Sequence, residues 1–464
     1  MPRKTSRCAP SRSASGSDAP DASREGPVIA AEPIGDAGLR VLFAPLEPFP
    51  VVILGVSGGS DSIAMMHLVA RWQDLYADQN RLILVATVDH GLRPESASEA
   101  AWVARQARGV GFAHETLQWE GEKPATGLQD GAREARYRLL AEMSWRFRDS
   151  GPVAIVTAHT EDDQAETFLM RLARGSGLDG LTGISPSRFL NAQDAVTLIR
   201  PLLGVAGARL AATLESRGLS WIEDPSNESD RFERVRLRKA RAHLEQIGLT
   251  NEKIALSARR LERAHDALEA AANALQSTSR LDVHEGAFAS LDATAFLNEA
   301  VDLRLRLLAR LIAAFGGQEQ APRLSKLEGL IERLEKPNYE ATLGGCIVAQ
   351  RDDEICVFRE PGRAGLPEVS LNPGTVSSWD RRFQVWASPD LGAGVNVRAL
   401  GGPAFAKLRK QLDGALPPAR AAATLPSFWQ AGELLAVPQL DYMCGVSSGG
   451  QDGGVALCWA KFLW

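Results

Sequence analysis

Short apolar runs alternate with amphipathic stretches through the first half of this 464-residue chain. Apolar runs of strand length occupy 51–56, 82–88, 152–158 and, more weakly, 115–119. Stretches with helical periodicity occupy 63–76, 96–110, 129–147 and 162–174. Strands that are apolar on both faces and separated by helices of this length are typical of a parallel sheet covered on both sides. The alternation therefore predicts a doubly wound α/β domain over 40–225.

The texture of the sequence changes after residue 226. Helical periodicity dominates 253–275 and 300–315, with no apolar strand between them, so we expect an α-helical middle domain over 226–336. Two apolar runs at 346–350 and 355–359 then flank an acidic turn, which predicts a hairpin. Gly- and Pro-punctuated short runs continue to the end, so 337–464 is expected to form a small α+β domain that binds RNA.

The first 27 residues are rich in Ser, Ala, Pro and Arg and contain no apolar segment of a secretory signal. Their arginines would suit an organelle transit peptide, but Asp18, Asp21 and Glu25 argue against one. We therefore expect a disordered tail over 1–27.

Composition narrows the class of protein. No uncharged run reaches the roughly 18–20 residues of a membrane span, so a soluble protein is expected. Five cysteines without a C-x-x-C pair disfavour a disulfide scaffold, a zinc ribbon and an iron–sulfur site, and indicate a reducing, cytoplasmic compartment. The net charge of −5 gives no hint of nucleic acid, so RNA would have to be bound by local clusters of Arg and Lys.

The first apolar run ends in Ser57-Gly58-Gly59-Ser60-Asp61-Ser62, directly before a helical stretch. Two glycines let the backbone N–H groups approach an anion, the serines add hydroxyl donors, and the helix N-terminus adds partial positive charge. The lysine of the Walker loop is absent, which disfavours a standard NTPase. An ordinary turn with Ser60 or Asp61 as helix cap is the alternative. The strand before and the helix after favour a pyrophosphate cradle, so these residues are expected to bind ATP.

Two further motifs carry polar groups to the same region. Asp89 and His90 follow the second strand, where side chains face the ligand crevice of such a sheet. Arg133 and Arg136 lie three apart on one helix face and could clamp phosphates. For His90 the alternative is a loop histidine without a ligand, and for the arginines a solvated helix face.

The third strand leads into Ala158-His159-Thr160-Glu161-Asp162-Asp163-Gln164-Ala165-Glu166-Thr167. Asp163 and Glu166 are three residues apart on one helix face, where two carboxylates could hold magnesium or the ammonium of an amine substrate. The alternative is that acids in the first turns complement the helix dipole. Arg174 and Gly175 form a second turn suited to an anion at the end of this helix.

In this order, the four motifs resemble those of the tRNA(Ile)-lysidine synthetases, a family of PP-loop ATP pyrophosphatases. The resemblance continues through Arg200-Pro201-Leu202-Leu203 and 221–227, and through Arg234, Arg236 and Arg238, where Val235 replaces the family's usual Asn. The Leu343-Gly344-Gly345-Cys346 hairpin is also similar. The resemblance is strong over 51–240 and weaker but colinear after it, up to Pro417-Pro418 and Val437-Pro438.

The resemblance implies a specific reaction. ATP would adenylate the C2 oxygen of the wobble cytidine in a CAU-anticodon tRNA(Ile), and the ε-amine of free L-lysine would then displace AMP. The product, lysidine, would change the identity of the tRNA from methionine to isoleucine. Asp61 would place Mg²⁺, Asp163 and Glu166 would position lysine, and Arg133 would stabilise charge in the adenylated intermediate.

A tRNA substrate requires positive charge on the surface. Arg234, Arg236, Arg238 and Lys239, with Arg231 and Arg241 beside them, form one cluster after the α/β domain. Lys407, Arg409, Lys410 and Arg420 form a second, for which a solvated face is an equal alternative. No protein partner is evident, and the sequence leaves a homodimer open.

Two alternatives to lysidine formation remain. Other PP-loop enzymes fit less well: a tRNA thiolase would need cysteine pairs, amidotransferring GMP or asparagine synthetases a glutaminase domain, and NAD synthetase leaves the match over 158–181 unexplained. A catalytically silent RNA-binding homologue is disfavoured because Asp61, Asp163 and Glu166 are intact.

Overall fold

The computed structural model describes residues 31–76, 81–121, 123–124, 127–191, 196–223, 233–318, 321–412, 414–444 and 457–464. The chain forms two compact units, Met1–Glu262 and Arg263–Trp464. The tail predicted over 1–27 lies outside the described residues.

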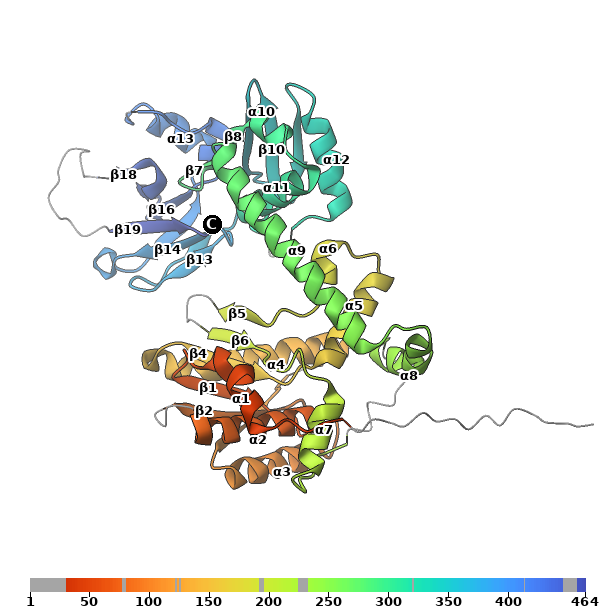
Figure 1. The fold of residues 1–464 in the computed structure, drawn as a ribbon. Coiled ribbons are helices and arrows are strands. Elements are labelled where there is room, and N and C mark those ends of the chain that lie inside the picture. Colours follow the sequence, from red (N-terminus) through yellow and green to blue (C-terminus); the bar gives the residue numbers. More distant parts are fainter. Residues whose placement is uncertain are drawn as a thin grey trace, which may run out of the picture. The chain divides into compact units, whose positions relative to one another are not determined.

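The first unit contains a six-stranded sheet in the order β3-β2-β1-β4-β6-β5 (Figure 1). Its strands are β1 (Val51–Gly55), β2 (Leu82–Asp89), β3 (Ala113–Gln118), β4 (Val153–Thr157), β5 (Ser187–Asn191) and β6 (Val196–Ile199). All neighbouring pairs are parallel except β5 with β6, which is antiparallel at the edge. The four strands expected from the apolar runs are thus confirmed, and the β5–β6 hairpin extends the sheet.

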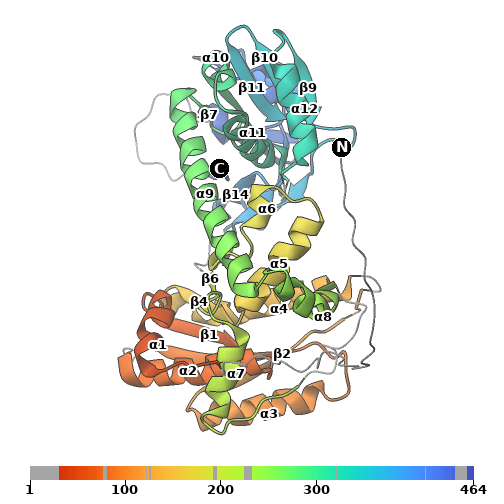
Figure 2. The same cartoon turned by 45° about the vertical axis from the view of Figure 1, so that its right-hand side comes forward.

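Helices cover both faces of this sheet (Figures 1 and 2). On one face lie α1 (Asp36–Phe43), η1 (Ala44–Leu46), α2 (Ser60–Tyr76), α3 (Ser96–Gly109) and α7 (Gly207–Glu215). The other face is covered by α4 (Leu128–Ser144), which is followed by η2 (Trp145–Ser150). Val52 and Leu54 of β1 pack into the first core and Val51 and Ile53 into the second, because successive strand side chains point to opposite faces. The doubly wound α/β architecture is confirmed.

The order of the strands determines where a ligand can bind. Strand β1 lies between β2 and β4. The connection that leaves β1 runs to β2 on one side, and the connection that leaves β4 runs to the β6–β5 pair on the other side. The connections at the carboxyl ends of β1 and β4 therefore leave in opposite directions. Such a switch point opens a crevice at the carboxyl edge of the sheet. The 57–62 loop follows β1, and α5 (Glu161–Ala173) begins just after β4.

Three more helices complete the described part of the first unit. They are α6 (Leu178–Leu181), α8 (Glu233–Gln246) and the beginning of α9 (Asn251–Thr278), which ends in the second unit. Arg238 of α8 pairs with Glu166 of α5, so the two helices are joined at their polar faces.

The second unit begins with a five-stranded antiparallel sheet in the order β7-β8-β11-β10-β9. Its strands are β7 (Asp282–His284), β8 (Phe288–Asp292), β9 (Glu340–Leu343), β10 (Cys346–Arg351) and β11 (Glu354–Arg359). Helices α10 (Ala293–Leu297), α11 (Val301–Gly316) and α12 (Leu324–Leu334) share its core. The hairpin expected around residue 352 is β10–β11.

This sheet corrects one expectation for the middle of the chain. No strand was expected between the helices at 253–275 and 300–315, but β7 and β8 lie there, and β8 pairs with β11. Strands on both sides of residue 337 therefore belong to one sheet. At three and five residues, these strands are too short and too polar to stand out as apolar runs.

The rest of the second unit contains two antiparallel sheets, in the orders β12-β15-β16-β17-β18 and β13-β14-β19. Their strands are β12 (Val369–Ser370), β13 (Ser377–Trp379), β14 (Phe383–Ala387), β15 (Val395–Ala399), β16 (Pro426–Gln430), β17 (Glu433–Val437), β18 (Tyr442–Met443) and β19 (Cys458–Phe462). The helical segments are η4 (Pro389–Leu391), α13 (Gly402–Leu408), α14 (Ala419–Ala422) and η5 (Pro438–Leu440). This end is α+β, as expected. Over the described parts of the chain, no helix has the length and apolarity to cross a bilayer.

Candidate active site

The 57–62 loop has the backbone of a tight anion-binding turn. Gly58 has a φ of +100°, and a Cβ there would lie 2.7 Å from Cδ1 of Ile222, so glycine is required on both counts. The Ser62 hydroxyl accepts hydrogen bonds from the N–H groups of Ser57 and Gly58, each at 3.2 Å, and donates to Gly59 O at 2.9 Å. Ser62, predicted to contact ATP, thus holds the loop together from inside.

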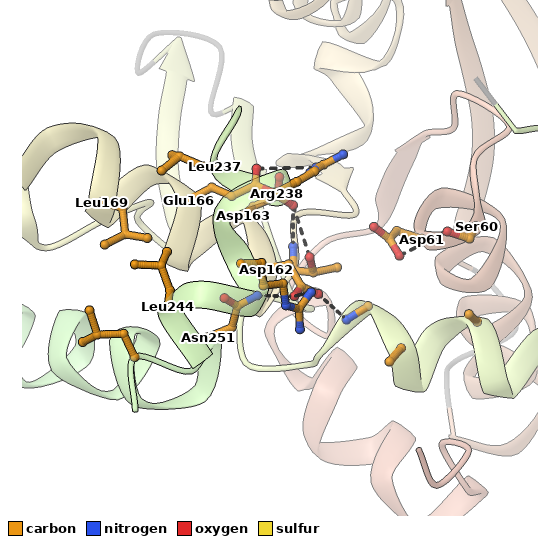
Figure 3. A pocket seen from close by; sticks show the side chains of 16 residues that line it. Ser60, Asp61, Asp162, Asp163, Glu166, Leu169, Leu237, Arg238, Leu244 and Asn251 are labelled. Atoms are coloured by element: carbon orange, nitrogen blue, oxygen red, sulfur yellow. Dashed lines mark hydrogen bonds and ion pairs between the residues drawn. The ribbon is translucent and has the colours of Figure 1, made fainter. Parts of the chain in front are cut away.

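A cavity of about 440 Å³ opens beside this loop at the carboxyl edge of the sheet (Figure 3). Its polar lining combines predicted residues with unpredicted ones. The residues predicted as site residues are Ser60, Asp61, Asp163, Glu166 and Arg238, and Arg241 was named only as a neighbour of the tRNA-binding cluster. The unpredicted ones are Thr160, Asp162 and Asn251. Apolar side chains, among them Leu169, Leu237 and Leu244, form the rest of the wall. The cavity can hold an amine with an aliphatic chain next to a phosphate loop.

Asp61 is a partly buried carboxylate whose nearest charged neighbours include two other acids. Burial, together with the charges of Asp163 and Asp162, raises its pKa to about 6, and Arg238 opposes this rise. Ser60 donates a hydrogen bond of 3.5 Å to Asp61 Oδ1, which also opposes the rise. A carboxylate that is partly buried among like charges favours a cation, so the site suits a metal ion or an ammonium group.

Glu166 lies deeper, with 9% of its side chain exposed. Arg238 Nε donates to Glu166 Oε1 at 2.6 Å, and Arg234 Nε lies 4.0 Å from Glu166 Oε2. Burial raises the pKa of Glu166, while the hydrogen bond and charge of Arg238 lower it. Two arginines predicted to bind tRNA therefore contact a carboxylate predicted to bind lysine.

Asp163 also caps its own helix. Its Oδ2 accepts hydrogen bonds from Thr160 N at 2.9 Å and from Thr160 Oγ1 at 3.3 Å, which forms a capping box at the start of α5. No described residue donates a hydrogen bond to Oδ1. Asp163 therefore caps the helix with Oδ2, as the alternative interpretation expected, while Oδ1 is available for a ligand.

Asp162 connects three helices around the cavity. It accepts hydrogen bonds from Gly207 N of α7 at 2.8 Å, Arg241 Nη1 of α8 at 3.1 Å and Asn251 Nδ2 of α9 at 2.5 Å. Asp162 was not predicted as a site residue, because its three partners lie 45 to 89 positions away along the chain. A run of three acids at a helix start, Glu161 to Asp163, was the available signal.

The protein-family model of the PP-loop domain matches residues 37–243. A tRNA(Ile)-lysidine synthase from Ruegeria pomeroyi is 37% identical over 412 residues, which are 89% of this chain and 92% of that protein. The chain belongs to the tRNA(Ile)-lysidine synthase family. Relatives of the same name from Bradyrhizobium sp. BTAi1 (42% identity, 71% of this chain, 96% of the relative) and Methylobacterium nodulans (45%, 67% and 91%) agree.

A likeness to a solved structure is weaker. A U34-tRNA thiolase from Methanococcus maripaludis aligns over 49% of this chain and 77% of its own, with a TM-score of 0.41 and 18% identity. The curated relatives and the family model confirm the family and the ATP-binding PP-loop fold that the sequence predicted.

Other motif residues of this lysidine synthase family member lie outside the cavity lining. Asp89 Oδ1 accepts a hydrogen bond from Gly91 N at 2.8 Å. His90 lies edge-on to Trp119 with ring centroids 5.7 Å apart, and burial lowers its pKa to about 4, so it is neutral at pH 7. Arg174 pairs with Glu233 at 2.5 Å, and Gly175 has a φ of +72° at the end of α5. Arg133 lies over the Tyr137 ring.

The carboxylates of the cavity fit a magnesium ion carried by phosphates. Within the described residues, no group of three or more His, Cys, Asp or Glu side chains is placed to hold a metal on its own. Mg²⁺ usually takes one or two protein carboxylates and completes its shell with phosphate oxygens and water. Asp61, with its raised pKa and its place on the phosphate loop, meets that requirement.

Proposed function

We propose that this protein joins free L-lysine to C2 of the wobble cytidine in a CAU-anticodon tRNA(Ile), using ATP. The observation that carries the proposal is the cavity in which Asp61 of the phosphate loop faces Asp163 and Glu166 of α5 (Figure 3). The phosphate loop and the carboxylates that would bind the amine then line the same cavity, as a ligation in two steps requires. The curated relatives bear the name of this activity.

In the first step the phosphate loop would hold the triphosphate of ATP. The N–H groups in the first turn of α2 have no partner inside the helix, so they and the helix dipole can bind anionic oxygens. The C2 oxygen of the cytidine would attack the α-phosphorus, and the bond to pyrophosphate would break. Mg²⁺ bound at Asp61 would neutralise phosphate charge. Arg133 would stabilise the charge that develops in the adenylated intermediate.

In the second step the ε-amine of lysine would attack C2, the bond from C2 to oxygen would break, and AMP would leave. The amine arrives as an ammonium and must lose a proton before it attacks. The raised pKa of Glu166 makes this carboxylate a better proton acceptor than an exposed glutamate, and Oδ1 of Asp163 is available to orient the nitrogen. The apolar wall at Leu169, Leu237 and Leu244 would contact the methylene groups of lysine.

The tRNA would bind over α8, with Arg234, Arg236, Arg238 and Lys239 as phosphate contacts. Arg238 then has two roles in turn, because it pairs with Glu166 in this structure. An incoming phosphate would draw Arg238 away and leave Glu166 to the ammonium of lysine. In the second unit, Arg420 pairs with Glu340 at 2.8 Å, so Lys407, Arg409 and Lys410 are the stronger candidates for RNA contact there. Free lysine and tRNA place the reaction in the cytoplasm, and the proposal requires no protein partner.

Incorporation of radiolabelled lysine into unmodified CAU-anticodon tRNA(Ile), with ATP and Mg²⁺, tests the proposal. Elongator methionine tRNA is the control substrate. Asp163→Asn should lower incorporation by about 10²–10⁴-fold, since it removes a charged group that positions the nucleophile. Asp149→Asn is the matched control, because that side chain is 96% exposed.

Label that appears in tRNA(Ile) alone, and that is lost only in Asp163→Asn, supports the substrate, the chemistry and the site together. Release of pyrophosphate without transfer of lysine would instead favour another PP-loop reaction. Binding of tRNA without pyrophosphate release would indicate a silent homologue.

A further inference from the structure

A second group of charged side chains lies at the same edge of the sheet as the cavity, outside its lining. Arg133 and Arg136 are in the first half of α4, which starts at the carboxyl edge. Arg200 directly follows β6, and Arg188 lies opposite Leu198 near the start of the antiparallel strand β5. Four arginines from three segments therefore converge at one place.

Tyr137 is the centre of this group. The guanidinium carbons of Arg133 and Arg188 lie 5.4 Å and 5.1 Å from its ring centroid. Arg200, only 4% exposed, donates from Nη1 to Ser185 O at 2.6 Å, while its Nε is buried without a partner. A guanidinium group that stacks on an aromatic ring does not use its N–H donors in that contact, so they remain free for a ligand beside the ring. The group is thus pre-arranged by packing.

The positive charge of this group is not neutralised within the described part of the protein. Arg133, Arg136 and Arg188 form no ion pair with any described residue. Burial lowers the pKa of Arg200, and the charges of Arg188 and Arg133 lower it further, against a hydrogen bond to Tyr137. Gathering like charges at a partly buried place costs free energy unless an anion binds there.

The exposure of the group shows from which side an anion can reach it. Arg200 is buried, Arg133 and Arg136 are half-buried, and Arg188 is exposed on the edge strand. The donors therefore form a path from solvent toward His159, next to the cavity. The charges of Arg200, Arg133 and Arg136 all act on His159, which itself precedes α5 by two residues.

We propose that Arg188, with Arg133 and Arg200, binds a backbone phosphate of the tRNA next to the nucleotide that reacts. The inference rests on the proposed function and adds a phosphate site on the β5–β6 edge that is separate from the phosphate loop and from α8. Three guanidinium groups carry more positive charge than one carboxylate ligand would require. Their planar pairs of N–H donors suit the two free oxygens of a phosphodiester. The α-carboxylate of free lysine is the competing oxyanion.

The test compares Arg188→Gln and Arg188→Lys with Arg138→Gln in the wild-type background of the full chain. Arg138 is the matched control, because it lies on α4 with 54% of its side chain exposed and pairs with Glu142. Arg188→Gln should raise the KM for tRNA about 10-fold and lower the slope of log affinity against log salt by about 0.7–0.9, as expected for one lost phosphate contact. The KM values for ATP and lysine should stay unchanged, and Arg188→Lys should recover part of the loss.

Two results would overturn the inference. One is an Arg188→Gln variant whose tRNA KM and salt slope equal those of Arg138→Gln. The other is a selective rise in the KM for lysine, which would assign the site to the carboxylate. If the wild type forms no lysidine, the proposed function fails. Direct tRNA binding by Arg188→Gln, with its salt slope, still decides whether the arginine group holds a phosphate.

Discussion

Two partly buried aspartates, one in each unit, have opposite surroundings. Asp380 in the second unit lies between Arg359, which donates to both of its oxygens at 2.9 Å and 3.0 Å, and Arg382, whose Nε donates at 2.6 Å. Asp61 in the first unit has Asp162 and Asp163 as its main charged neighbours, and its pKa rises to about 6. Arg359 and Arg382 neutralise the charge of Asp380, whereas among the described residues Arg238 is the one cation that acts against the raised pKa of Asp61.

This difference separates charge that stabilises the fold from charge that is kept for a ligand. Arg382 is fully buried, and it also donates to Thr424 O at 2.6 Å, so the Asp380 group joins several segments of the second unit. Around Asp61 the fold gathers like charges beside a cavity. A ligand that brings a cation, such as the magnesium complex of ATP, would supply the positive charge that Asp61 lacks.

Among the variants that test this comparison, neutralising Asp380 has the largest expected effect. Asp380→Asn keeps the size of the side chain and tolerates the φ of +49° at this position. However, it leaves the buried guanidinium group of Arg382 and the half-buried one of Arg359 without this counter-charge. We expect a loss of about 3 kcal/mol in the free energy of unfolding of the second unit. Calorimetry of the thermal transitions measures this loss, and the affinity for ATP should not change.

The control for that variant is Asp282→Asn. The Asp282 side chain is 65% exposed, and it pairs with His284 of the same strand. It should unfold within about 0.5 kcal/mol of the wild type. Equal stability of the two variants would contradict the structural role given to Asp380.

The next effect concerns the spacing between the carboxylates of the cavity. A Cβ at Gly207 would lie 2.9 Å from Asp162 Oδ2 and 3.5 Å from Asp61 Oδ1. The first distance is too short and the second is an ordinary contact, so Gly207→Ala should displace the Asp162 carboxylate beside Asp61. We expect kcat/KM for lysidine formation to fall about 10–100-fold, as small misplacements in an active site do. Initial rates with tRNA, lysine and ATP measure the effect.

Gly204→Ala is the matched control, because Gly204 lies three residues before Gly207, in the connection between β6 and α7, and a Cβ there meets no atom within 4 Å. Its activity should stay within about twofold of the wild type. Similar losses in both variants would show that the connection, and not the position of the carboxylates, limits the rate.

The two units also differ in how far the sequence predicted them. Strands β1, β2 and β4 are continuous apolar runs that end in polar motifs, so both the sheet and the residues at its carboxyl edge could be predicted. Asp61, Asp163 and Glu166 meet in the cavity because they follow the adjacent strands β1 and β4 at the switch point of the sheet, and Arg238 of α8 pairs with Glu166 there.

Long-range partners could not be predicted in either unit. Asp162 depends on Gly207, Arg241 and Asn251, and nothing in the local pattern indicates those contacts. Strand β8 of the second unit pairs with β11, more than 60 residues later, and its short mixed pattern hides it. Packing between distant segments, rather than local periodicity, determines both.

The smallest expected effect is on the free energy of unfolding without ligands, and it tests directly whether the charge of Asp61 destabilises the fold. A carboxyl whose pKa is about 6 in the folded protein and 3.8 in the reference state binds a proton more tightly when folded. Stability then falls as pH rises from about 4 to 6 and stays low above it. Asn carries no charge at any pH, so Asp61→Asn should be more stable than the wild type by about 1–2 kcal/mol at pH 7.5, or a few degrees in Tm.

That gain should shrink as the pH approaches 4, because the wild-type carboxyl is then protonated in the folded protein. Thermal unfolding of both proteins at pH 7.5 and pH 4.5, without ATP and Mg²⁺, gives the difference at each pH, and Asp149→Asn controls for a surface charge. An equal gain at both pH values, or none at pH 7.5, would contradict the electrostatic strain at Asp61. A gain in stability together with a loss of lysidine formation would show that the fold retains this charge at its own cost, for the ligand and not for the structure.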